Sequence, residues 1–129
     1  MADDDRWQKG FEKFEQVYCG DVVPLPRGSS AFFDLMMENL FCDVWTREEL
    51  DQRDRRLLMI GAIAALGEHM TFGIQLKAAL KLGELTPDQA REVLIHMSQY
   101  VGYPRVAPLV AIVEQKIAEV AKEQAEGDG

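Results

Sequence analysis

The sequence predicts an all-α protein, and three observations support this prediction. Apolar residues recur at three- and four-residue steps along most of the chain, as they do on one face of a helix. Capping residues, prolines and glycines separate these stretches where helices would start and stop. No segment alternates apolar and polar residues like a strand over more than a few positions. We therefore expect about six helices in one domain over residues 1–129.

The first expected helix covers residues 7–18. Its aromatic residues lie on one face and are Trp7, Phe11, Phe14 and Tyr18. The polar ends of the chain, residues 1–6 and 125–129, are expected to fray. Two prolines in residues 20–28 predict an extended connector after the first helix.

Capping residues predict where the next helices begin. Ser29 or Ser30 can cap a helix that runs to about Phe41. Thr46 followed three residues later by Glu49 has the pattern of a capping box, so a short helix is expected there as well.

The helix expected over residues 52–66 is unusually apolar. Asp51 can cap it, and Gly67 can end it. Its second half, residues 57–66, is apolar on every side and must therefore be covered all round. In a chain this short, we expect part of that cover to come from another subunit, which predicts an oligomer.

Three more helices are expected in the rest of the chain. One covers residues 69–82 and ends at Gly83. Residues 86–89 combine a threonine cap, a proline at the first helical position and a glutamine three residues after the cap, and they begin a helix that runs to Val101. The last helix follows Pro104.

Composition excludes several classes of function. The net charge of −8 argues against nucleic-acid binding, which needs a basic patch, and against binding to an anionic membrane surface. The two cysteines, Cys19 and Cys42, form no Cys-x-x-Cys pair and predict reduced thiols in a cytoplasmic protein. No apolar run is long enough to span a bilayer, and no signal peptide is expected. No metal site is expected, because His69 and His96 have no third ligand at a recognisable spacing.

Several short segments share their order and spacing with a known family. They are residues 41–45 with Arg47, residues 50–55, the apolar run that ends at Gly67, residues 76–80 with Gly83, residues 85–94 and residues 96–104. No single segment is decisive, but the ordered set resembles the carboxymuconolactone decarboxylase family. The resemblance covers about residues 30–115, which we take as the core of the domain.

This resemblance implies both a fold and an activity. It implies a helical subunit of the AhpD-like fold, assembled as trimers or hexamers, with active sites among helices near subunit interfaces. The implied activity is that of a lyase: decarboxylation of 4-carboxymuconolactone to an enol-lactone in aromatic-compound degradation, without a cofactor.

The sequence departs from both branches of the family. A related branch uses a Cys-x-x-Cys-x-x-x-His motif, and Glu68, Thr71 and Gln75 occupy those positions here. Thiol redox chemistry needs a thiolate and a resolving thiol, so a peroxidase is rejected. In the decarboxylase branch a histidine commonly stands at the position of Gln75. A glutamine can hydrogen-bond a substrate but cannot shuttle a proton.

Three residues are candidates for moving protons in a decarboxylation. His69, His96 and Glu68 are the predicted catalytic residues, because histidine exchanges protons near neutral pH and Glu68 is adjacent to one of the two histidines. The alternatives are a solvated helix start for Glu68 and His69, and an interface histidine for His96.

Four residues are candidates for holding the substrate. Arg56, Gln75, Tyr100 and Asp43 are the predicted binding residues. Arginine pairs with carboxylates in a two-pronged geometry, and Tyr100 shares a helix face with His96. Asp43 would orient an arginine. Surface ion pairing is the alternative for the arginine.

The function predicted from the sequence is a cofactor-free decarboxylase for a lactone or a related small carboxylate. Two alternatives stay open. One is a divergent paralogue that binds a different acid, such as a secondary-metabolite intermediate, and the other is a non-enzymatic helical oligomer.

Overall fold

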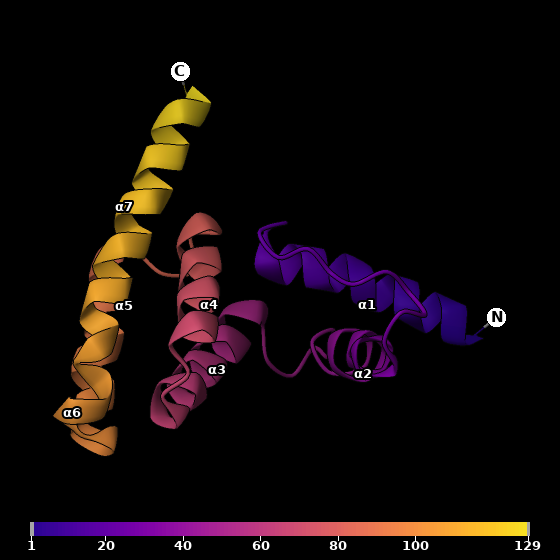
Figure 1. Cartoon of the computed structure of the whole chain (residues 1–129), viewed down its shortest axis with the longest axis horizontal. Helices are drawn as coiled ribbons and strands as arrows, with labels where there is room; N and C mark the ends of the chain where they lie inside the picture. Colours follow the sequence, from indigo (N-terminus) through magenta and orange to yellow (C-terminus); the bar gives the residue numbers. More distant parts are fainter. Residues whose placement is uncertain (1, 129) are drawn as a thin grey trace. The chain divides into compact units, whose positions relative to one another are not determined.

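The computed structural model describes residues 2–128, and all regular structure in this range is helical (Figure 1). The elements are α1 (Ala2–Tyr18), α2 (Ala31–Leu35), the π-helix η1 (Met36–Cys42), α3 (Gln52–Leu66), α4 (His69–Lys81), α5 (Pro87–Val101), α6 (Tyr103–Val106) and α7 (Pro108–Asp128). The all-α prediction is therefore confirmed for the described residues. Contacts divide the chain into two compact units, residues 1–55 and residues 56–129, and each is considered separately. One domain over the whole chain stays a prediction.

In the first unit, α1 packs against η1. Gly10 is buried and lies so close to η1 that a Cβ placed on it would be 1.8 Å from the carbonyl oxygen of Met37. Next to this contact, the ring of Phe14 meets the ring of Phe41 edge-on, with 5.1 Å between their centroids. The glycine lets two backbones approach closely, and the aromatic rings fill the space beside them.

The start of α1 differs from the expectation. Fraying of residues 1–6 is wrong for residues 2–6, because α1 begins at Ala2. Asp5 pairs with Lys9 one turn later at 3.2 Å, and acidic residues are favoured near the positive end of a helix dipole. The other end also stays helical, since α7 continues to Asp128.

The helix expected after Ser30 forms but changes type. Ser30 caps α2 by accepting a hydrogen bond from the backbone N–H of Phe33, as predicted. From Met36 the chain continues as η1, and beyond its end the N–H of Asp43 donates to Glu38 C=O at 3.1 Å and that of Trp45 to Leu40 C=O at 2.9 Å, each five residues back. The short helix predicted after Thr46 is wrong: residues 43–50 form turns and bends. The Thr46 hydroxyl instead donates to the carbonyl of Cys42 and closes the end of η1.

In the second unit, α4 is the central helix of the core. Figure 1 shows α4 alongside α7, and seven of the 13 residues of α4 are buried. The core side chains are Ile60, Ala64, Phe72, Leu76, Ala79, Leu80, Leu85, Ala90, Leu94, Val106, Leu109, Val113 and Val120. These side chains come from α3 to α7 and, for Leu85, from the connection between α4 and α5, so this core holds α3 to α7 together.

The predicted helix boundaries of this half of the chain are largely confirmed. The Asp51 carboxylate accepts from the N–H of Asp54 at 2.8 Å at the start of α3. Gly67 and Gly83 follow α3 and α4 with φ of 73° and 70°, a conformation that glycine adopts without strain. The final helix begins later than expected, because α6 ends at Val106 and α7 starts at Pro108. Proline lacks an N–H and fits a first helical position better than a helix interior.

Removing the cap of α5 should weaken the second unit measurably. Thr86 Oγ1 accepts from the N–H of Gln89 at 3.1 Å, and the Gln89 side chain accepts from the N–H of Thr86 at 3.0 Å. We expect Thr86→Ala to lower the free energy of unfolding by about 1 kcal/mol. Urea unfolding followed by circular dichroism measures this change. A midpoint equal to that of the wild type would contradict a stabilising cap.

Candidate functional site

The predicted site residues do not all come together. Four locations hold them: Arg56 with Gln75 in the core of the second unit, Glu68 with His69 at the start of α4, His96 with Tyr100 on α5, and Asp43 in the first unit. Gln75 is six residues beyond His69 along α4, which is about 9 Å of helix.

Arg56 forms a buried polar network with Gln75 and Glu84. Its Nη1 donates to Gln75 Oε1 at 2.6 Å, and its Nε donates to Glu84 Oε1 at 2.8 Å. The side chains of Arg56 and Gln75 have no exposed surface, and that of Glu84 is 9% exposed. Gln75 Nε2 is buried and has no hydrogen-bond acceptor among residues 2–128. The structure therefore joins two predicted binding residues and adds Glu84, which neutralises the arginine.

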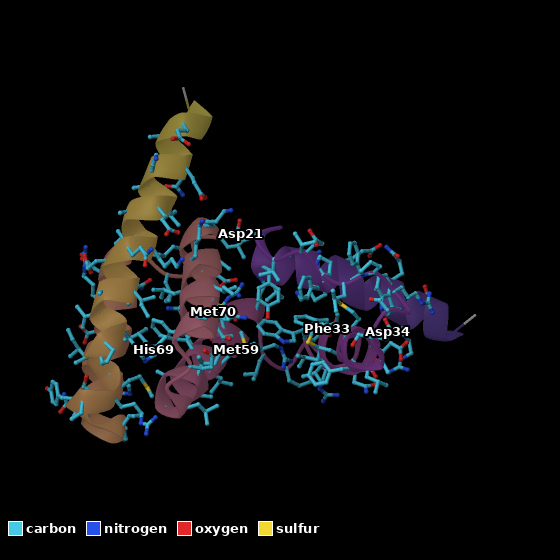
Figure 2. All side chains as sticks on the ribbon, in the orientation of Figure 1. Asp21, Phe33, Asp34, Met59, His69 and Met70 are labelled. Carbon is cyan, nitrogen blue, oxygen red and sulfur yellow. The ribbon has the colours of Figure 1, made fainter. Side chains whose placement is uncertain are left out.

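An open cleft lies at the corner between α3 and α4. Its volume is about 490 Å³, and its lining consists of Gly67, His69, Val101, Pro104, Arg105 and Pro108. Figure 2 labels His69 at the first turn of α4, where its side chain is exposed. A Cβ on Gly67 would lie 2.8 Å from Arg105 Nη1, so the guanidinium passes directly over the glycine. The cleft thus combines a cation, an imidazole and apolar walls.

Arg105 is the residue of this cleft that sequence reasoning missed. Its side chain makes no hydrogen bond or ion pair with any part of the chain that the structure describes. An unpaired guanidinium can bind a carboxylate through two parallel N–H donors. A signal for it exists in the sequence, since Arg105 is the one charged residue in residues 101–113.

Glu68 has a local structural partner. It precedes α4 and accepts a hydrogen bond from the Thr71 hydroxyl, which is the largest cause of a lowered pKa for its carboxyl group. The positive charge that His69 can carry acts in the same direction. At neutral pH Glu68 is therefore a carboxylate, which suits the start of a helix better than the donation of a proton.

His96 and Tyr100 contact each other but lie outside the cleft that holds His69. Their ring centroids are 5.2 Å apart, and both side chains are exposed, Tyr100 by 79%. They share a helix face, as their spacing predicts.

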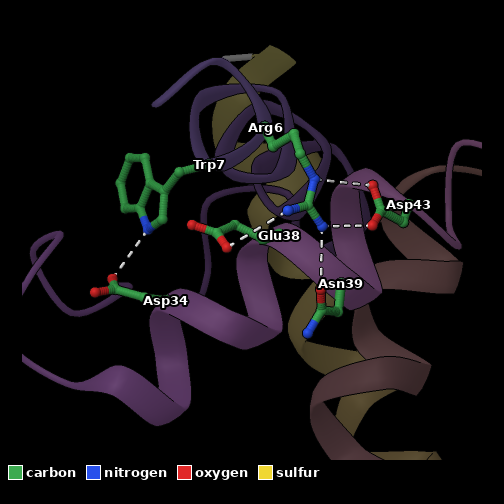
Figure 3. Close-up of polar contacts among 6 residues, drawn as sticks. All are labelled: Arg6, Trp7, Asp34, Glu38, Asn39 and Asp43. Atoms are coloured by element: carbon green, nitrogen blue, oxygen red, sulfur yellow. Dashed lines mark hydrogen bonds and ion pairs between the residues drawn. The ribbon is translucent and has the colours of Figure 1, made fainter. Parts of the chain in front are cut away.

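Asp43 binds an arginine of its own unit. Arg6 donates to Asp43 at 2.5 Å and to Asn39 at 3.1 Å, and its guanidinium lies 3.8 Å from the Glu38 carboxylate (Figure 3). The hydrogen bond from Arg6 is the main reason why the pKa of Asp43 is lowered. In the same unit, the indole of Trp7 donates to Asp34 at 3.1 Å. These contacts tie α1 to α2 and η1.

Within the described residues, no group of three or more His, Cys, Asp or Glu side chains could hold a metal ion. Over the same residues, no helix combines the length and apolar character needed to cross a membrane.

Comparisons with known proteins agree on one kind of chemistry. The model of the carboxymuconolactone decarboxylase family matches residues 30–115. A 4-carboxymuconolactone decarboxylase from Acinetobacter baylyi is 28% identical over 109 residues, which cover 81% of each chain. The nitrosuccinic acid decarboxylase npaB from Metarhizium robertsii is 26% identical over 87 residues, which are 67% of this chain and 60% of that protein.

Proposed function

Since the chain belongs to the carboxymuconolactone decarboxylase family, we propose that it is a cofactor-free decarboxylase of a small organic acid and that the His69–Arg105 cleft binds the substrate. The observation that carries this proposal is the unpaired guanidinium of Arg105 beside an imidazole in one open cleft. The two relatives described above support the reaction type, because both are named as decarboxylases.

The reaction replaces a carboxylate by hydrogen. The bond to the carboxyl carbon breaks, CO2 leaves, and the electron pair moves into an adjacent unsaturated carbonyl or nitro group. The carbon then takes up one proton. Such a reaction needs a positive group that stabilises the developing negative charge and an acid that protonates carbon.

The proposed roles follow from the positions of the side chains. Arg105 holds a carboxylate and the developing charge, and protonated His69 donates the proton. Arg56, which the sequence predicted to contact the substrate, could do so only if its ion pair with Glu84 were broken. Gln75 Nε2 has no acceptor among residues 2–128, but the side chain is fully buried and does not line this cleft.

A second substrate is favoured by two observations. Gln75 stands where the decarboxylase branch commonly has a histidine, and the similarity extends to a nitrosuccinic acid decarboxylase. A nitro group accepts the electron pair of the leaving carboxylate as an unsaturated lactone does. We therefore propose a divergent decarboxylase of another small acid as the alternative to 4-carboxymuconolactone, which would place the protein outside aromatic-compound degradation.

The test supplies the purified protein with 4-carboxymuconolactone or with nitrosuccinic acid and measures the release of CO2. If the cleft is the site, His69→Ala should lower kcat about 100-fold or more, whereas Arg105→Ala should chiefly raise KM. Arg105→Lys should recover part of the binding, because the charge is kept.

Two exposed residues outside the cleft provide matched controls. His96→Ala removes the other histidine, and Lys122→Ala removes a cation from α7. Both variants should keep the wild-type kcat and KM. If His96→Ala abolishes turnover and His69→Ala does not, the cleft is the wrong site. If neither acid releases CO2, the proposed substrates are wrong.

A further inference from the structure

The backbone of Gly67, over which the Arg105 guanidinium lies, is held in place by a turn. Gly67 follows α3 with φ of 73°, and its N–H donates to Ala64 C=O at 3.2 Å. The next N–H, that of Glu68, donates to Ile63 C=O at 3.3 Å. These two hydrogen bonds form a Schellman motif, which ends α3 with the glycine in the left-handed conformation. The backbone at Gly67 therefore cannot move aside without breaking the end of the helix.

The Arg105 guanidinium uses the space that the missing side chain of Gly67 leaves free. Its Nη1 lies 2.8 Å and its Cζ 4.0 Å from the position that a Cβ on Gly67 would take. Non-bonded heavy atoms pack at about 3.5–4.0 Å, so a Cβ and this guanidinium cannot occupy these positions together. The next carboxylate along the chain, that of Glu68, accepts from the Thr71 hydroxyl and forms no ion pair with Arg105 among residues 2–128.

An added Cβ at Gly67 would displace Arg105 and leave the backbone where it is. The colliding atom belongs to the end of a long side chain, which can turn away, whereas the turn at Gly67 is fixed by its two hydrogen bonds. A guanidinium binds a carboxylate best through two parallel N–H donors, and this geometry requires the group to point in one direction. Turning it away would weaken carboxylate binding and leave His69 unchanged.

We propose that Gly67 is a positioning residue of the His69–Arg105 cleft, because its lack of a side chain places the Arg105 guanidinium where it binds a carboxylate of the substrate. This inference rests on the proposed function, since it takes the cleft as the substrate site. It assigns the affinity for the acid to the size of residue 67 and leaves the protonation step to His69.

Gly83 provides a matched control. It follows α4 with φ of 70°, and the same two hydrogen bonds end that helix, one to Leu80 C=O at 3.2 Å and one to Ala79 C=O at 2.9 Å. A Cβ on Gly83 meets nothing within 4 Å. Alanine at either glycine has the strain of a left-handed backbone, but only Gly67→Ala collides with Arg105.

The first test measures carboxylate binding without turnover and uses succinate as an unreactive probe. The chain has two histidines, so proton NMR can follow the imidazole signals of His69 and His96 separately while succinate is added to the full-length protein. The signal of His69 should move, and that of His96, which lies outside the cleft, should not. Gly67→Ala should raise the dissociation constant about tenfold, as expected when one hydrogen bond to a charged group is lost. Gly83→Ala should leave the dissociation constant unchanged.

The second test asks whether Gly67 acts through Arg105. Arg105→Ala should weaken succinate binding, and adding Gly67→Ala to it should weaken binding no further, because the group that the Cβ displaces is already absent. With an acid that releases CO2, Gly67→Ala should raise KM and keep kcat. Urea unfolding followed by circular dichroism should give Gly67→Ala and Gly83→Ala similar midpoints, because the two variants share the same backbone strain.

The results distinguish this inference from the proposed function. If Arg105→Ala binds succinate weakly but Gly67→Ala binds it as tightly as Gly83→Ala does, Gly67 has no positioning role and the cleft is still the site. A further loss of binding from Gly67→Ala in the absence of the Arg105 side chain would also overturn the positioning role. If Arg105→Ala binds succinate as tightly as the wild type, both the cleft and the positioning role are wrong. If the variants bind succinate as expected but no acid releases CO2, the positioning role is supported and the decarboxylase is wrong.

Discussion

Replacing Arg56 by alanine is expected to lower the free energy of unfolding of the second unit by about 3–5 kcal/mol, the usual effect of breaking a buried ion pair. The variant leaves the carboxylate of Glu84, which is 9% exposed, without its cation. It also leaves Oε1 of Gln75 without its donor and opens a space in a fully buried position. Each of these changes destabilises the folded state.

The matched control removes both charges. Arg56→Met with Glu84→Leu replaces the pair by apolar groups, and such replacements are often neutral or stabilising. Circular dichroism during urea unfolding should be used, because both tryptophans, Trp7 and Trp45, belong to the first unit. If Arg56→Ala and the double variant unfold at the same urea concentration, the network does not stabilise the unit through its charges.

Replacing Gly10 by alanine is expected to have the second large effect, a loss of about 3 kcal/mol or more in the first unit. The added Cβ would lie 1.8 Å from the carbonyl oxygen of Met37 and 2.6 Å from its carbonyl carbon. Both are backbone atoms, so no side-chain rotation relieves the clash and α1 must move away from η1. The higher helix propensity of alanine, about 1 kcal/mol, offsets only part of this cost.

Tryptophan fluorescence during unfolding measures the change, because Trp7 and Trp45 both report on this unit. Gly127→Ala is the control, since a Cβ there meets nothing within 4 Å, and it is followed by circular dichroism because Gly127 belongs to the second unit. The control should be neutral or slightly stabilising. A Gly10→Ala variant as stable as this control would show that α1 and η1 are not in close contact.

Local signals in the sequence predicted most of the fold. Thr86, Asp51, Gly67 and Gly83 mark their helix ends correctly, because capping and left-handed turns depend on neighbouring residues. Thr46 led to a wrong prediction of a short helix, because a threonine hydroxyl can either cap the next helix or donate to the carbonyl four residues earlier. Its sequence spacing is the same in both cases, and only the fold selects between them.

The candidate site was harder to predict because it depends on contacts between distant residues. Arg56 and Gln75 were both selected from the sequence, and the structure joins them. Their partner Glu84 lies in the connection between α4 and α5, where no periodic pattern exists. Arg105 was overlooked because its approach to Gly67 depends on how α6 folds back toward the end of α3.

The π-helix η1 gives the first unit a place where the length of the chain can change. Each π turn holds about one residue more than an α turn, so deleting a single residue within η1 would let α2 continue as an ordinary α-helix. The residues after the deletion would keep their orientation around the helix axis, because the turn then closes with one residue fewer. A deletion before Phe41 would therefore leave its ring facing Phe14. The same deletion in a regular α-helix such as α1 would turn every later side chain by about 100°.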